Sequence, residues 1–182
     1  MDINSIVRVD ITEEMIAEAQ AEQKWLDENK EGAKTRDAYH NKTLIGSLGH
    51  QAVEHTFENM DFAYTSTRKI KYKQGDTYDI QYENDYIDVK ATHGKLDEKW
   101  FFNKEFLVFQ AQLDDPKIDL ITHFVFVLVD MDEREAYIFG AIHRSDFMSN
   151  SNEVKANNYL KWDNRAIKAK QLKPFISYIC RT

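Results

Sequence analysis

The sequence predicts an α/β fold in which a central mixed β-sheet is flanked by helices. Helix-like patterns at 12–29 and 44–59 precede strand-like alternation at 62–92 and a long apolar stretch with its return strand at 120–143. This order of helices and strands is typical of layers packed on one sheet. The 182 residues, 42% of them hydrophobic, are enough for a single domain with a sizeable core.

The domain is expected to begin with a helical segment at about residues 1–43. Thr12 is a suitable N-cap for a helix over 12–29, and two acidic residues follow it in the first turn. Negative charge at that end of a helix is favourable because it opposes the helix dipole. The next stretch, 30–42, is polar and is predicted to be a loop.

A second helix is predicted over 44–59, where apolar residues recur in two rows at helical spacing. Three strands should follow, one at about 63–73 and two more in a hairpin on either side of Glu83-Asn84. The aromatic-rich stretch 100–113 is expected to be a helix because of its length. Residues 120–130 are almost continuously apolar and predict a strand buried on both faces.

The hairpin carries the residues that suggest a chemical function. Side chains two apart in a strand share a face, so Asp88 and Lys90 project together. A two-residue turn at Glu83-Asn84 places Asp79 directly opposite Asp88. Two carboxylates and an ammonium group would then meet, which is chemistry for holding a divalent metal beside a phosphate. The alternative is a surface hairpin with a cross-strand ion pair of little energetic value.

Sequence context distinguishes Asp88/Lys90 from other acid-x-lysine triplets, in which an acidic residue stands two before a lysine. Only at Asp88 do alternating β-branched and aromatic residues flank the triplet, with a second acid on the partner strand. The other five triplets lie in polar, charged or proline-containing stretches: Glu22/Lys24, Glu28/Lys30, Asp97/Lys99, Asp115/Lys117 and Glu153/Lys155.

This pattern resembles the PD-(D/E)xK nuclease superfamily, which has the restriction-endonuclease-like α/β sandwich fold. Asp79 matches its first acid, Asp88 its second acid and Lys90 its lysine, while Tyr78 stands where a proline is common. The resemblance implies that Mg²⁺, for which Mn²⁺ can substitute, binds Asp79, Asp88 and the backbone carbonyl of Val89. It also implies that Lys90 serves the reacting phosphate and the attacking water.

Two further residues become candidates through the same resemblance. Many of these nucleases carry an acidic residue on a glycine-bearing helix before the core strands, and Glu54 is the candidate here for catalysis and metal binding. An exposed helical glutamate is the alternative. Many also carry a glutamine on the helix after the lysine strand, which suggests Gln110; a simple helix-end glutamine is the alternative.

DNA contacts are expected from basic residues near the hairpin. Lys69, Lys71 and Lys73 would line one side of a strand, and Lys95 follows the strand that carries Lys90. Such side chains can contact phosphates, although a solvated edge strand would look the same. The net charge of −7 argues mildly against unspecific, high-affinity DNA binding.

These observations predict a Mg²⁺-dependent DNA endonuclease, with a homodimer favoured if both strands are cut. A junction resolvase or recombination exonuclease would share the same site. The competing hypotheses are a nucleic-acid-binding module of the same fold that lacks catalysis, and a protein-interaction domain.

The composition predicts a cytoplasmic protein with no membrane partner. No run of 18 apolar residues is present, the first residues do not resemble a secretory signal, and Cys180 is the only cysteine. Zinc is not expected, because His50 and His55 are turned about 140° apart on a helix with 100° per residue. One cysteine also cannot build a thiolate site.

Overall fold

The computed structural model describes residues 2–29, 37–67, 78–157, 160 and 162–180, and it confirms a mixed α/β fold. Its centre is a six-stranded sheet in the order β1-β7-β6-β4-β3-β2, in which β4 and β6 run parallel and the other neighbours are antiparallel. The strands are β1 (Val7–Asp10), β2 (Thr65–Ser66), β3 (Ile80–Tyr82), β4 (Asp85–His93), β6 (His123–Asp130) and β7 (Glu135–His143).

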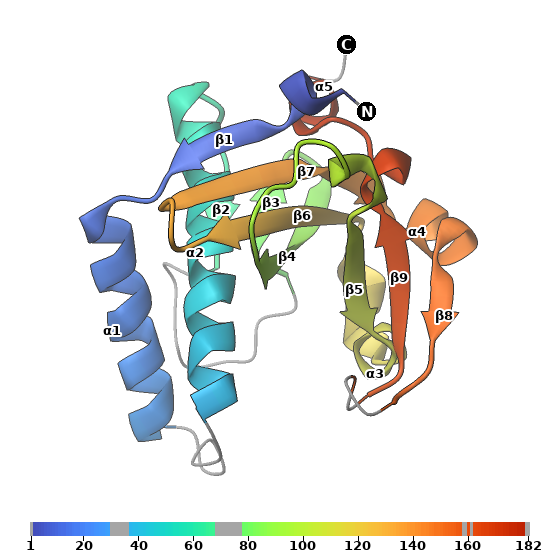
Figure 1. Ribbon diagram of the computed structural model, residues 1–182, viewed down its shortest axis with the longest axis horizontal. Coiled ribbons are helices and arrows are strands. Elements are labelled where there is room, and N and C mark those ends of the chain that lie inside the picture. The colour runs from blue at the N-terminus through green and yellow to red at the C-terminus, as the bar shows by residue number, and fades with distance from the viewer. Residues whose placement is uncertain (1, 30–36, 68–77, 158–159, 161, 181–182) are drawn as a thin grey trace.

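A second, three-stranded antiparallel sheet of β5 (Glu105–Phe109), β9 (Asn164–Lys168) and β8 (Asn152–Val154) forms another layer. Figure 1 shows α1 and α2 side by side on one side of the molecule and this small sheet on the other. The α-helices are α1 (Glu13–Asn29), α2 (Asp37–Asn59), α3 (Gln110–Leu113), α4 (Arg144–Asn150) and α5 (Phe175–Ile179). Short 3-10 helices span Ile3–Ser5, Phe101–Asn103, Pro116–Leu120 and Ala169–Gln171.

Strand β6 joins the two halves of the core. Its odd-numbered residues, such as Val125 and Val127, pack in the cluster formed with α1, α2 and α5. Its even-numbered residues, such as Phe124 and Phe126, pack against the small sheet and α4. Because side chains alternate across a strand, a strand covered on both faces must be apolar throughout, as the sequence predicted for this stretch.

Helix α2 lies unusually close to β4. A Cβ atom built on Gly49 would lie 2.4 Å from the Cβ of Ala91, a distance that real side chains do not tolerate. Glycine at this position therefore lets the helix settle on the strand. Gly46, one turn earlier, would meet nothing within 4 Å, so the close approach is specific to Gly49.

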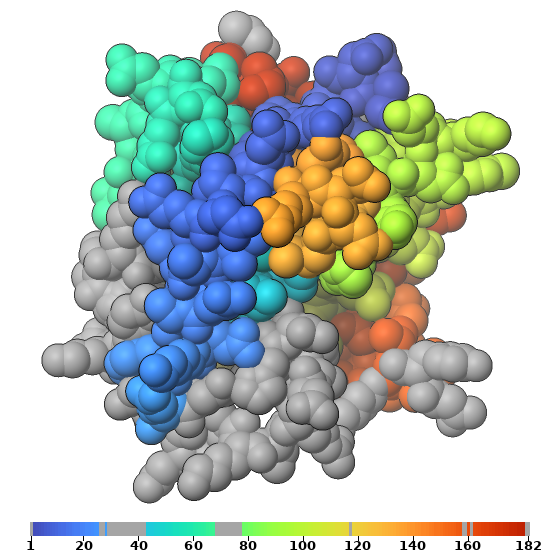
Figure 2. All heavy atoms as spheres, turned by 60° about the vertical axis from the view of Figure 1, so that its left-hand side comes forward, coloured from blue at the N-terminus to red at the C-terminus, as the bar shows by residue number. Residues whose placement is uncertain are grey.

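The N-terminal segment contains a strand as well as the predicted helix. Strand β1 pairs with β7, and the Ile11 amide then donates to the carbonyl of Arg134, which also forms an ion pair with Glu13. Figure 2 shows the surface of α1 directly beside that of the β6–β7 turn. This segment therefore belongs to the main sheet. Helix α2 also begins at Asp37, so the predicted loop over 30–42 is helical from that residue onward.

The prediction of a helix over 100–113 is wrong. After one 3-10 turn the chain forms β5, and only Gln110–Leu113 is α-helical. Phe106 and Val108 are buried, whereas Leu107 and Phe109 are exposed. The sequence of β5 lacks the alternation of apolar and polar residues that identifies a strand, because its outward-facing residues are also apolar.

Smaller differences occur elsewhere. The predicted strand at 63–73 is present only as β2 within the part that the structure describes, and β8 follows α4 in a region for which no element was predicted. Helix α4 has His143 as its N-cap and buries Phe147. No helix among the described residues is long and apolar enough to span a membrane.

Candidate acidic site on strand β4

The β3–β4 hairpin has the predicted register. Ile80 lies opposite Ile87 and Tyr82 opposite Asp85, so Glu83 and Asn84 form a two-residue turn. Glu83 adopts φ of 51°, the left-handed conformation that tight hairpin turns require. Extending this pairing by one residue brings Asp79 to the level of Asp88, as the sequence predicted.

Asp88 and Lys90 share the face of β4 that is turned away from α2. In the parallel pairing with β6 they lie beside Phe124 and Phe126, whose side chains face the small sheet. The Lys90 Nζ donates to Asp88 Oδ1 at 2.6 Å. Only 20% of the Lys90 side chain and 10% of the Asp88 side chain are exposed, so this ion pair is largely shielded from water.

Asp79 completes the predicted acidic pair at the edge of β4. Its Oδ2 accepts a hydrogen bond of 2.7 Å from the backbone amide of Val89. The N–H and C=O of one strand residue point to the same side, so the Val89 carbonyl also faces this edge. Asp79, Asp88 and the Val89 carbonyl are thus arranged around one short stretch of β4.

The Asp88 carboxyl is buried, and the nearby positive charge of Lys90 does not fully offset the cost of ionising it there. Burial raises the pKa of its carboxyl to about 6, and the neighbouring negative charge of Asp79 adds to the increase. Lys90 opposes the shift through its charge and hydrogen bond but does not cancel it. A carboxyl with a pKa near neutrality beside a second carboxyl is a common feature of functional sites.

Gln112 is a site residue that the sequence did not identify. Its Nε2 donates to Asp88 Oδ2 at 3.0 Å, so Asp88 is held at both oxygens, by Lys90 and by Gln112. The predicted candidate Gln110 instead donates to Asp114. The available signal was a polar residue in an apolar stretch, but assigning 100–113 to one helix obscured which glutamine faces β4.

Glu54 is buried, which contradicts the alternative of an exposed helical glutamate, with only 3% of the residue accessible. Its Oε1 lies 3.8 Å from the Nε2 of His50, one turn earlier on α2, and the same nitrogen is 3.4 Å from the Ser66 hydroxyl. Within the described part of the chain, no three His, Cys, Asp or Glu side chains are grouped closely enough to hold one metal ion. Glu54 therefore does not join Asp79 and Asp88 in this arrangement.

The predicted DNA-contacting lysines are not gathered at this site by the structure. Lys95 is paired with Asp132 at 2.8 Å and is mostly exposed. It follows Asp88 by seven residues, which corresponds to roughly 20 Å along an extended chain. Lys69, Lys71 and Lys73 lie outside the described residues.

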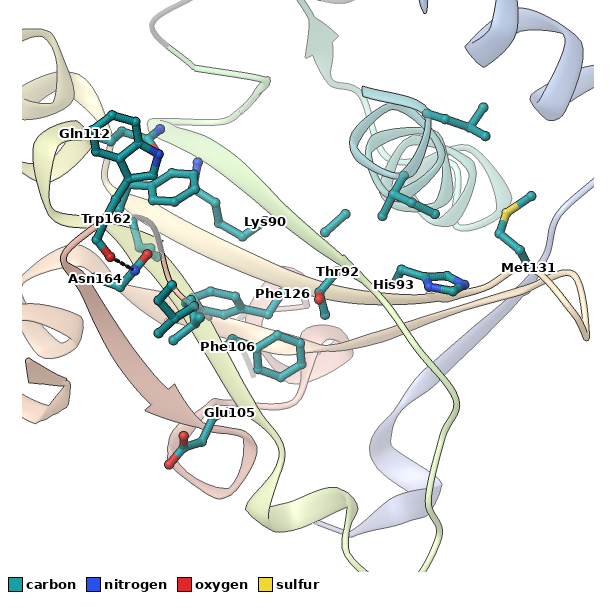
Figure 3. Close-up of a pocket in the computed structure, with 17 residues that line it drawn as sticks. Lys90, Thr92, His93, Glu105, Phe106, Gln112, Phe126, Met131, Trp162 and Asn164 are labelled. Atoms are coloured by element: carbon teal, nitrogen blue, oxygen red, sulfur yellow. Dashed lines mark hydrogen bonds between the residues drawn. The ribbon is translucent and has the colours of Figure 1, made fainter. Parts of the chain in front are cut away.

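A cavity of about 900 Å³ opens beside the acidic site, between β4, Leu44 and Ile45 of α2, and the small sheet. Lys90 and Gln112 line it together with Phe126, Trp162 and Asn164. Figure 3 shows Lys90 extending from β4 toward the end of the cavity where Gln112 and Trp162 lie. The acidic site is thus continuous with a space large enough for a ligand.

The donor set fits a magnesium ion. Mg²⁺ prefers oxygen ligands and retains several waters, so one or two protein carboxylates are sufficient to hold it. Asp79 and Asp88 supply two carboxylates, and a cation placed between them would offset the negative charge that Asp79 adds beside Asp88.

No family model matches the chain, and no match was found among curated proteins or solved structures. The functional interpretation must therefore rest on the chemistry of Asp79, Asp88 and Lys90.

Proposed function

We propose that this chain is a Mg²⁺-dependent DNA endonuclease on a restriction-endonuclease-like fold, with Mn²⁺ able to replace Mg²⁺. The observation that supports the proposal is the meeting of Asp79, Asp88 and Lys90 at one edge of β4. Two acids that can hold a cation lie beside a base that can contact a phosphate, and a cavity adjoins them.

In this proposal Asp79 and Asp88 hold the metal ion. When bound, the ion neutralises phosphate charge and lowers the pKa of a coordinated water. Asp88 must be ionised for this task, and with a pKa of about 6 it is mostly ionised only above that pH. Gln112 keeps the Asp88 carboxylate oriented through its hydrogen bond to Oδ2.

Lys90 has the second role. Its ammonium is bonded to Asp88 Oδ1, and a cation on that carboxylate would weaken this attraction and make the ammonium available to a phosphate oxygen. A positive group already fixed where charge accumulates in the transition state stabilises that state without reorganisation. The partial burial of Lys90 strengthens this effect, because charges interact more strongly away from water.

Cleavage of supercoiled plasmid in Mg²⁺, Mn²⁺ or EDTA tests the proposal. We expect Asp88→Asn and Lys90→Met each to reduce metal-dependent cleavage by about 100-fold or more, the loss typical of removing a group that stabilises transition-state charge. Glu153→Gln and Lys155→Met are the matched controls, because they alter an exposed acid-x-lysine triplet. Undiminished cleavage by Asp88→Asn would contradict the assignment.

A nucleic-acid-binding module without catalysis is the second candidate. It is favoured by one observation: both oxygens of Asp88 are already engaged, by Lys90 and by Gln112. Such a module would bind DNA in a salt-sensitive manner. It would yield no product after prolonged incubation with Mg²⁺ or Mn²⁺, and the plasmid experiment therefore separates the two candidates.

A further inference from the structure

The cavity beside Lys90 has an aromatic mouth. Trp162 is 56% exposed and Phe109 is 44% exposed, although both line this cavity. Leu107 on β5 is also exposed and lines it. Large apolar side chains rarely gather at a solvent-accessible cavity without a ligand to cover them.

The position of Trp162 is fixed by the residues that follow it. Asp163 accepts hydrogen bonds from the Ala156 amide and from Lys155 through its carboxylate, and its carbonyl accepts one from the Gln110 amide. Asn164, which is buried, donates to the carbonyl of Trp162 itself, as Figure 3 shows. An indole whose backbone is held in this way loses little conformational freedom when a ligand stacks on it.

The lining favours a flat, largely neutral group over a phosphate. Among the described lining residues, the side chains that carry a full charge at neutral pH are Lys90 and Glu105, which have opposite signs, and Lys90 is already paired with Asp88. Most of the rest are apolar or aromatic. Away from Lys90 an anion would gain little in such a space, whereas a nucleobase could stack on an aromatic ring and use Gln112 or Asn164 for hydrogen bonds.

The cavity is also connected to the acidic site. Gln112 and Lys90 both line the cavity, and each donates a hydrogen bond to one carboxylate oxygen of Asp88. A phosphate held beside Lys90 would therefore have its attached nucleoside at the entrance of the cavity. Base faces are covered by their neighbours in a duplex, so only an unpaired base can enter.

We propose that this cavity accepts an unpaired nucleobase, and that the preferred substrate is therefore DNA with a single-stranded segment. The proposal rests on the proposed nuclease function and specifies its substrate class. Trp162 is the principal stacking residue.

Binding in EDTA tests the cavity without any cleavage. The probe is a fluorescein-labelled oligonucleotide of about 16 nucleotides, near the upper site size for a single-strand-binding domain, measured by anisotropy as a single strand and as the matching duplex. We expect Trp162→Ala to weaken single-strand binding by about 10-fold, within the roughly 5- to 150-fold range that corresponds to one stacked base. Duplex binding should change by less than about twofold, because no base is unstacked in the duplex.

Two variants control this experiment. Trp162→Phe retains an aromatic ring and should restore most of the single-strand affinity. Trp100→Ala removes another exposed tryptophan, 63% accessible, that lines a separate cavity, and it should leave binding unchanged. Equal affinity of Trp162→Ala and the unmodified protein for the single strand, or an equal loss for both DNA forms, would overturn the proposal.

The same variants in a Mg²⁺ cleavage assay separate the two hypotheses. Cleavage that depends on Asp88 but is indifferent to Trp162 and to strandedness would overturn the base cavity and leave the nuclease intact. Single-strand binding that depends on Trp162, without cleavage by any form, would support the cavity and contradict the nuclease.

Discussion

Among the described residues, two acid-x-lysine triplets form ion pairs within the triplet, and the two pairs differ in burial and in their neighbours. Lys90 and Asp88 lie 2.6 Å apart, with 20% and 10% of their side chains exposed. Lys155 and Glu153 lie 3.6 Å apart, with 73% and 64% exposed. The comparison shows that an acid two residues before a lysine can form an ion pair with it. Burial then determines whether the carboxyl of that pair has a shifted pKa.

The neighbours of each pair explain the difference further. Lys155 also lies 3.2 Å from Asp163, and Glu153 also lies 3.9 Å from Arg165, so each member of the exposed pair has a second partner of opposite charge. Asp88 instead has a second acid, Asp79, close enough to raise its pKa. The first arrangement is typical of a protein surface. The second concentrates negative charge at one point, which favours a cation.

The largest difference we expect between the pairs is in the pH dependence of stability. Burial raises the pKa of Asp88 from an ordinary value of 3.8 to about 6, so the folded state binds a proton more tightly than the unfolded state. The stability that this proton provides is fully present below pH 3.8 and is lost as the pH rises through 6. The loss amounts to about 3 kcal/mol at most, at 1.36 kcal/mol per pKa unit.

Asp88→Asn should remove this loss. In the absence of divalent metal, urea unfolding at pH 7.5 should therefore show the variant to be more stable than the unmodified protein by about 1–3 kcal/mol, with little difference near pH 4. Glu153→Gln should follow the unmodified protein across this range. A destabilised Asp88→Asn at neutral pH would mean that the Lys90 contact outweighs the burial of the charge.

The second prediction concerns how the buried triplet is positioned. Gly49→Ala forces a methyl group onto Ala91, the next residue after Lys90, and overpacking of this kind typically costs about 1–3 kcal/mol. Gly46→Ala meets nothing within 4 Å and should stabilise the helix by about 0.5–1 kcal/mol. Chemical denaturation of both variants measures the difference. Similar behaviour of the two would show that β4 shifts freely away from α2.

Much of the main sheet was predictable from local sequence, because hairpin chemistry and apolar period are local signals. Two-residue spacing and the turn at Glu83-Asn84 placed Asp79, Asp88 and Lys90 together before any tertiary information was used. The continuous apolar stretch that became β6 was similarly clear. In the hairpin and in β6, the apolar residues that the sequence pattern predicts to be buried are the ones that the fold buries.

The second sheet could not be predicted in the same way. The exposed positions of β5 are Leu107 and Phe109, so the alternation that identifies a half-buried strand is missing. Its partner β9 lies more than fifty residues later in the chain. The role of Gln112 depends on this long-range pairing, since it is β5 that carries α3 to Asp88. Because exposed apolar residues line the cavity, the sequence pattern predicted neither β5 nor the contact of Gln112 with Asp88.

The third prediction uses the metal ion to distinguish the pairs. A ligand that binds only the folded protein stabilises it by about 1.4 kcal/mol at tenfold excess over its Kd. For a chain of this size that corresponds to a rise in Tm of about 3–6 °C. Mg²⁺ should produce this rise in the unmodified protein and in Glu153→Gln, but not in Asp88→Asn. An equal rise in all three would place the metal elsewhere.

The smallest effect is expected from breaking the exposed pair. Lys155→Met should leave the free energy of unfolding almost unchanged, because solvent-exposed ion pairs gain little over their hydrated partners. Lys90→Met should act differently, since Lys90 is the group that holds the pKa of Asp88 down, and its removal should move that pKa above 6. Carbon-13 NMR titration of the aspartate carboxyls in both variants measures this directly. If Lys155→Met shifted the Asp88 resonance as much as Lys90→Met, the two triplets would be electrostatically coupled, and burial alone could not explain why only one of them has a raised carboxyl pKa.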